Sequence, residues 1–69
     1  MFIKRTNQKQ LFVNTNNYRN SHGADPKRKQ YGSWAFVVDG ETVFQTGTFA
    51  EAAVTVANAN GLDSIVVLS

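Results

Sequence analysis

The stretch that decides the fold is residues 31–61, YGSWAFVVDGETVFQTGTFAEAAVTVANANG. Its first half holds two runs of strand-forming residues on either side of Asp39-Gly40, and Asp-Gly readily supplies the positive φ angles of a two-residue type I′ hairpin turn. Along the first run Trp34 and Phe36 share one face, while the residues between them share the other. The pattern predicts a β-hairpin that carries apolar side chains on both faces.

The second half of this stretch changes to a helical period. Thr48 is a good N-cap and Glu51 follows three residues later, which is the capping-box arrangement. Asn60-Gly61 then offers a left-handed stop. A helix is therefore expected over about residues 49–60, with an apolar stripe at helical spacing made of Phe49, Ala52, Ala53, Val56 and Ala57.

Two further strands are expected outside this stretch, over about residues 10–15 (QLFVNT) and 64–68 (SIVVL). Residues 16–31 lack periodicity and collect Asn, Ser, Gly, Asp and Pro, so they are interpreted as a long basic loop. Residues 1–9 are expected to form a flexible tail. The 69 residues make one small domain near the lower limit for a self-sufficient core.

The element order strand, strand, strand, helix, strand predicts an α+β fold. The first three strands fit an antiparallel meander, and the helix is a right-handed crossover on one face of the sheet. If the last strand pairs parallel to the first, the sheet order is 3-2-1-4. That order puts residues 64–68 at an edge of the sheet.

Composition restricts the chemistry. The chain has no cysteine and a single histidine, His22, which argues against a disulfide framework, a thiolate zinc site or a histidine-rich metal site. We expect no cofactor and no metal. Polar residues interrupt the N-terminus at once, and no apolar run approaches the roughly 20 residues that span a bilayer, so a cytoplasmic location without membrane contact is the expectation.

The order of these patterns resembles the N-terminal half of the ribonuclease H-like fold. The resemblance rests on FVNTNNY at the end of the first strand, the hairpin YGSWAFVVDGETVFQTG and the helix-strand segment TFAEAAVTVANANGLDSIVVLS. A weaker resemblance connects the chain with HicB-type antitoxins, which use a partial fold of this kind to bind a small toxin. A regulator this short and free of cysteine would fit a protein encoded by a phage or another mobile element.

The resemblance implies a site of clustered carboxylates that holds two magnesium ions. Its first aspartate maps to Asn14, a neutral amide, and its helix glutamate maps to Glu51. Its third carboxylate would fall just beyond Ser69. One carboxylate binds a hard divalent cation weakly, so we expect a truncated form that is not an enzyme. A degenerate nuclease that takes carboxylates from a partner chain is the least favoured alternative.

The leading hypothesis is a regulator or inhibitor that binds another protein through an exposed sheet edge or face, or completes its core as a homodimer. The candidate contacts are the last strand together with large apolar residues of the hairpin: Ile65, Val66, Val67, Leu68, Trp34, Phe36 and Phe44.

The alternative hypothesis is a nucleic-acid-binding module. All seven Lys and Arg residues lie within residues 1–29, and only Asp25 opposes them there. Cations interleaved with aromatic residues can contact phosphates and stack on bases. The candidate contacts are Arg19, Lys27, Arg28, Lys29, Tyr18 and Tyr31, with Lys4, Arg5 and Lys9 as additions.

Overall fold

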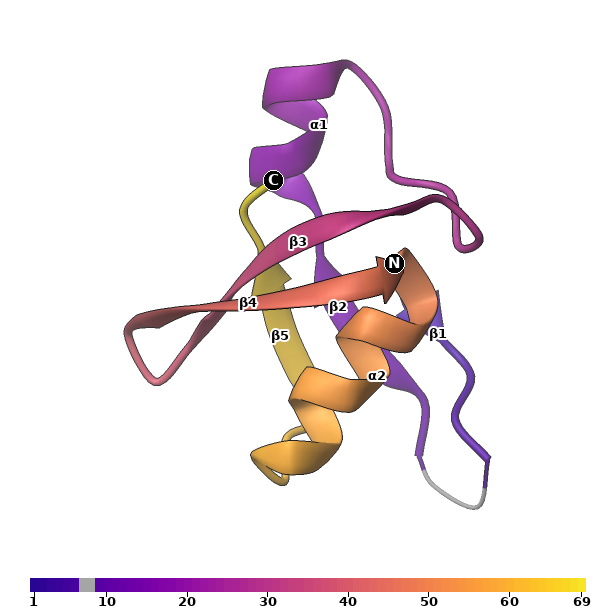
Figure 1. Cartoon of the computed structure of the whole chain (residues 1–69), viewed down its shortest axis with the longest axis vertical. Helices are drawn as coiled ribbons and strands as arrows, with labels where there is room; N and C mark the ends of the chain where they lie inside the picture. The colour runs from indigo at the N-terminus through magenta and orange to yellow at the C-terminus, as the bar shows by residue number, and fades with distance from the viewer. Residues whose placement is uncertain (7–8) are drawn as a thin grey trace.

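The computed structural model describes residues 1–6 and 9–69, which form a five-stranded mixed sheet with two helices (Figure 1). The fold is therefore α+β, as expected. In chain order its elements are β1 (Phe2–Ile3), β2 (Leu11–Asn14), α1 (Asn16–His22), β3 (Tyr31–Val38), β4 (Glu41–Thr48), α2 (Phe49–Ala59) and β5 (Ser64–Val67).

The strands are arranged across the sheet in the order β1-β2-β5-β3-β4. β2 and β5 run parallel, with Val13 opposite Ile65, while β3 is antiparallel to both β5 and β4. β1 pairs antiparallel with β2 and places Phe2 opposite Phe12. β4 and β1 thus form the two edges of the sheet.

The hairpin and the crossover helix agree with the sequence. Asp39 and Gly40 have φ angles of 51° and 79°, as a type I′ turn requires. The Thr48 hydroxyl accepts a hydrogen bond of 3.3 Å from the Glu51 backbone N–H and caps the start of α2. The helix ends at Ala59, one residue before the predicted end.

The predicted sheet order 3-2-1-4 is wrong. The parallel pairing of the last strand with the first is confirmed, but β5 lies between β2 and β3 rather than at an edge. β3 therefore does not pair with β2, and the expected three-stranded meander is broken. The position has a physical reason: a strand that is apolar on both faces is best accommodated in the middle of a sheet, where both neighbours satisfy its backbone.

The segment expected as a loop over residues 16–31 contains the helix α1. Its end is marked by Gly23, whose φ of 83° is left-handed, and its Tyr18 side chain is buried in the core. The Thr15 hydroxyl donates a 2.6 Å hydrogen bond to Asp25 and fastens the returning chain to the start of the helix.

The segment expected as a flexible tail over residues 1–9 contains the edge strand β1. Beyond it, the Arg5 guanidinium pairs with Asp63 at 2.5 Å and donates to the Leu62 carbonyl and the Asn58 side chain, both at 3.0 Å. Part of the predicted tail, residues 7–8, lies outside the residues that the structure describes.

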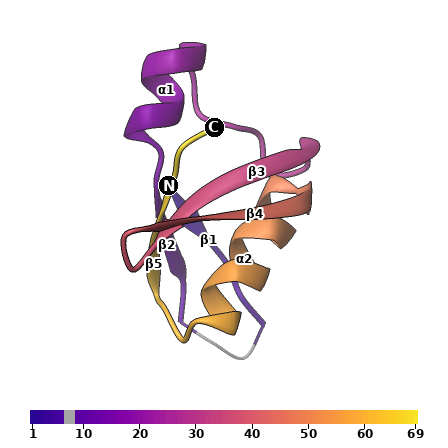
Figure 2. The ribbon, with the colours of Figure 1, turned by 60° about the vertical axis from the view of Figure 1, so that its left-hand side comes forward.

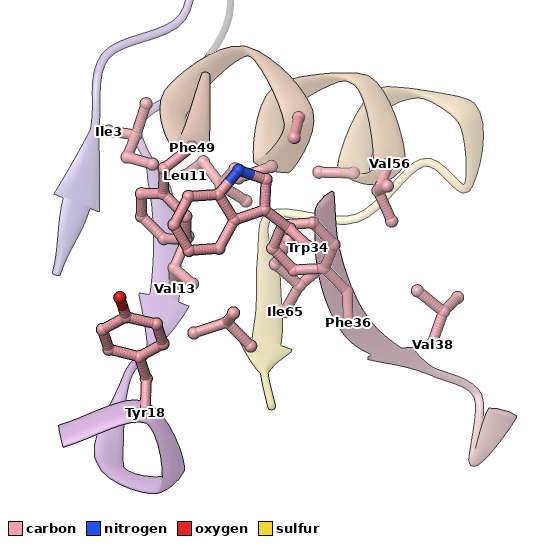
Figure 3. Close-up of a cluster of buried hydrophobic side chains, with 14 residues drawn as sticks. Ile3, Leu11, Val13, Tyr18, Trp34, Phe36, Val38, Phe49, Val56 and Ile65 are labelled. Carbon is pink, nitrogen blue, oxygen red and sulfur yellow. The ribbon is translucent and has the colours of Figure 1, made fainter. Parts of the chain in front are cut away.

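The core lies between α2 and one face of the sheet. Phe36, Phe49, Leu11, Val13 and Val67 are its largest fully buried side chains. Figure 3 shows Trp34 and Phe36 on the sheet beneath α2, with Tyr18 closing one end from α1. The Trp34 ring meets Phe49 edge-on at 5.0 Å, and its indole N–H donates to the Gly47 carbonyl at 3.0 Å.

α2 packs on only one face of the sheet (Figure 2). Its buried residues share the core with the inward residues of β2, β3 and β5. The opposite face is covered by no helix among the residues that the structure describes.

Candidate protein-binding surface

The uncovered side of the sheet, here called the open sheet face, is defined by the strand register. Residues directly opposite each other on paired strands point to the same face, and residues along one strand alternate. Phe2, Phe12, Val66 and Val37 are therefore on this face, because their chain neighbours belong to the core. Apart from Thr48, the last residue of β4 and the N-cap of α2, the set is Phe2, Phe12, Asn14, Tyr31, Ser33, Ala35, Val37, Thr42, Phe44, Thr46, Ser64 and Val66.

None of these twelve side chains carries a charge. The face instead exposes aromatic rings: Phe2 is 57%, Phe12 37%, Phe44 71% and Tyr31 74% exposed. Phe2 and Phe12 lie against each other with ring centroids 5.2 Å apart and planes tilted by 58°. A sheet face that only meets water is usually polar, so an uncharged face with several large exposed rings has the composition of a contact surface.

Two half-buried aliphatic residues, Val37 and Val66, occupy the middle of the open sheet face on the adjacent strands β3 and β5. They lie between the Phe2–Phe12 pair at the β1 edge and Phe44 on the β4 edge. The apolar side chains therefore extend across the sheet from one edge to the other.

The structure changes the expected set of protein contacts. Ile65, Val67, Trp34 and Phe36 are core residues and lack the surface that a partner would need, which corrects their proposed contact role. The cause is the register: within the apolar run of β5 alternate residues turn inward, so only Val66 reaches the open sheet face. Leu68 is half-buried just beyond β5, and its N–H donates to the Ala35 carbonyl. Phe44 remains fully available.

Sequence reasoning missed Phe2 and Phe12 as surface residues. The signal was present for Phe12, because it alternates with the two buried residues Leu11 and Val13. Phe2 could not be placed in the same way, since residues 1–9 were interpreted as a tail. Its position depends on the pairing of β1 with β2.

The predicted nucleic-acid contacts are only partly at the surface. Tyr18 is buried and stacks on His22 at 4.1 Å, so its ring is not free to stack on a base. Arg19 approaches Asp25 at 3.3 Å and donates to Asn16 at 2.8 Å.

The remaining predicted contacts Lys27, Arg28, Lys29 and Tyr31 are exposed. The Arg28 guanidinium donates a 2.7 Å hydrogen bond to the Phe2 carbonyl and so ties the basic loop to the edge strand β1. The Arg28 carbonyl accepts a 3.0 Å hydrogen bond from the Ala50 N–H at the start of α2. Arg5, in contrast, has a side chain only 4% exposed and is a structural residue.

The positions that the ribonuclease H-like resemblance singled out do not meet. Asn14 pairs with Val66 on the open sheet face, whereas Glu51 belongs to α2 on the opposite face. The Asn14 side-chain oxygen accepts the Asn16 backbone N–H at 3.0 Å, a local turn contact. Among the described residues no three His, Cys, Asp or Glu side chains gather in a way that could hold a metal ion.

An open hollow of about 350 Å³ lies between the start of the chain and α2. Lys4, Arg5 and Glu51 are the charged groups among its lining residues, together with Ile3, Thr6, Ala50, Val54 and Thr55. It offers no histidine, no thiol and only one carboxylate. These side chains do not form the nucleophile–base or paired-carboxylate arrangement that acid–base or covalent catalysis uses.

Comparisons of this chain with protein-family models, with curated proteins and with solved structures find no match. Within residues 1–6 and 9–69 no helix has the length and apolar character needed to cross a membrane.

Proposed function

We propose that this chain is a non-catalytic protein-binding module, a regulator or inhibitor that acts through the open sheet face. The observation that supports this proposal is the absence of charge on a face that exposes four aromatic rings. The centres of protein–protein interfaces are depleted of charged residues and enriched in aromatic ones. The binding energy would be concentrated on a few such anchors, and Phe2 and Phe12, which lie against each other, are two candidates.

The size of the molecule is compatible with this role. A standard interface buries about 800 Å² on each partner, which is under a fifth of the 4374 Å² surface of this chain. The strands of the open sheet face are also held in place by the core. Val13 follows Phe12 and Ile65 precedes Val66, and this opposite pair belongs to the packed core. A rigid face loses little conformational entropy on binding, which favours affinity.

Capture of partners from the native host tests the proposal with matched variants. Phe12→Lys introduces a charge into the face, whereas Thr55→Lys changes an exposed residue of α2 on the opposite side. We expect the wild type and Thr55→Lys to retain the same protein and Phe12→Lys to lose it. Equal capture by all three proteins, or no protein retained by the wild type, would contradict the proposal.

A second candidate function is binding of single-stranded nucleic acid. The contact between Arg28 and the Phe2 carbonyl favours it, since it ties a loop with three cations to the strand that carries the exposed Phe2 ring. Cations that follow a backbone and rings that stack on bases are the two parts of a single-strand site. The open sheet face itself contributes no cation, which is why this function ranks second.

A salt titration with single-stranded RNA and DNA separates the two functions. If Lys27 and Lys29 each contact a phosphate, replacing both by Ala lowers the slope of log affinity against log salt by about 1.4. Arg28 is left intact, because its hydrogen bond to β1 has a structural role. A slope that does not change, or no binding at low salt, would eliminate this candidate.

A further inference from the structure

The outer edge of β4 lacks the features by which proteins protect exposed strands. β4 pairs with β3 over all eight residues in continuous register, without a bulge, and has no second neighbour among the residues that the structure describes. It contains no Lys and no Pro, and its single charge is Glu41 at the start. Edge strands are usually shielded by such residues, by bulges or by a covering element, because their free N–H and C=O groups pair with other chains.

The hairpin fixes which backbone groups of β4 point outward. In a two-residue hairpin the residues that flank the turn, Val38 and Glu41, form a hydrogen-bonded pair, and such pairs alternate along an antiparallel ladder. Thr42, Phe44 and Thr46 therefore direct their N–H and C=O groups away from β3. Their side chains all lie on the open sheet face, and the Phe44 ring is mostly in solvent. The Thr46 carbonyl accepts a 3.4 Å hydrogen bond from the Gln45 side-chain amide and can accept a second one.

We propose that a second copy of this chain binds at this edge, with the two β4 strands antiparallel and Phe44 on the two-fold axis. In this register Phe44 faces Phe44 of the second copy, and Thr42 faces Thr46 of the second copy. All three outward residues of each copy then form both of their backbone hydrogen bonds. Thr48 is not needed for this strand pairing. As the N-cap of α2, its carbonyl already accepts the first hydrogen bond of the helix.

The side chains of this strand are complementary to themselves in that register. A pair of aromatic rings and two Thr–Thr pairs are favourable cross-strand neighbours. Glu41 faces Gly47 of the second copy, so no two like charges meet across the junction. The two-fold axis is perpendicular to the sheet, and the two open sheet faces join into one continuous surface. A junction of one strand pair is small, so we expect a weak dimer with dissociation in the micromolar range.

Light scattering over about 1 µM to 500 µM tests the association. The wild type should change from the 7.6 kDa mass of one chain toward twice that value as its concentration rises. Phe44→Lys puts two like charges on the axis and should remain a single chain throughout. Tyr31→Lys is the matched control, because Tyr31 is equally exposed on the same face but lies in the inner strand β3, and it should dimerise as the wild type does.

Cross-linking tests the register, since the chain has no cysteine of its own. Opposite residues of a hydrogen-bonded pair lie about 5.5 Å apart. Two copies of Thr42, or two of Thr46, are offset by four residues, about 13 Å along the strand. A short bis-maleimide should therefore link an equal mixture of Thr42→Cys and Thr46→Cys chains far more than either variant alone.

The inference is overturned by a single-chain mass at every concentration, by Phe44→Lys associating as the wild type does, or by cross-linking that mixing does not increase. This inference concerns the β4 edge and goes beyond the proposed function. A chain that stays single yet captures a partner through Phe12 would overturn the dimer and leave the proposed function intact.

Discussion

Replacing Phe36 by Ala should remove most of the stability of this protein. Phe36 has no exposed surface, stacks on Phe49 with ring centroids 6.3 Å apart and faces Val67 across the sheet. Truncation of a buried Phe to Ala costs about 3–5 kcal/mol, because the transfer energy is lost and a cavity remains. A chain of this length is stable by roughly 3–10 kcal/mol in total, so the variant should be marginally folded or unfolded.

Urea denaturation followed by the fluorescence of Trp34, the single tryptophan, measures the effect. With a slope of about 1 kcal/mol per molar urea for so small a chain, the midpoint should fall by about 3–5 M. Phe36→Leu nearly conserves volume and should cost about 1 kcal/mol, which keeps the effect measurable if the Ala variant does not fold. Low protein concentration excludes a contribution from dimerisation.

Phe44→Ala is the matched control for this prediction. Phe44 lies on the neighbouring strand but is mostly in solvent, so its truncation should change the stability by no more than about 0.5 kcal/mol. An unchanged midpoint for Phe36→Ala, or an equal loss for Phe44→Ala, would refute the assignment of these rings to core and surface.

Two further substitutions test contacts outside the core, namely those of Arg5 and the Thr48 cap of α2. Arg5→Ala leaves the Leu62 carbonyl without its guanidinium donor and should cost about 2 kcal/mol in urea denaturation, whereas the exposed Lys4→Ala should cost less than about 0.5 kcal/mol. An equal loss of stability in Arg5→Ala and Lys4→Ala would show that the contacts of Arg5 do not stabilise the fold. Thr48→Ala removes the cap of α2 and should cost about 1 kcal/mol, while Thr48→Ser should retain most of the stability.

The parts of the fold that the sequence predicts well are those set by neighbouring residues. The Asp39-Gly40 turn and the cap of α2 by Thr48 each depend on residues within four positions of one another. Their geometry follows from backbone sterics and from one local hydrogen bond. The common direction of β2 and β5 was also predictable. A meander gives the strands β2 and β4 the same direction, and the crossover helix returns β5 parallel to β4.

α1 illustrates what local patterns miss. Its seven residues, Asn16–His22, are mostly poor helix formers, and its N-cap Thr15 makes no side-chain capping bond. The helix is held by contacts with distant residues, namely the burial of Tyr18 beside Trp34 and the hydrogen bond from Thr15 to Asp25. These contacts arise only once the sheet is assembled.

The sequence predicted that a candidate surface exists, but not which strands form it. An exposed edge and an uncovered face followed from having a single crossover helix, yet the sequence assigned the edge to residues 64–68 rather than to β4. Of its candidate contacts Phe44 is exposed, whereas Ile65 and Val67 are buried. Both alternatives satisfy the same alternation of side chains, because period-2 patterning gives the face of a residue but not the neighbours of its strand.

The sequence by itself determined the turn, the crossover helix, the strand character of four apolar runs, and a composition with no cysteine and one histidine. Only the tertiary structure decided that β5 takes the central position and that β4 becomes an edge. The physical reason is that strand order depends on which of several pairings buries the most apolar surface on both sides of β5. These alternative strand pairings involve residues more than fifty positions apart, from Leu11 to Val67, so no local sequence pattern predicts which of them forms.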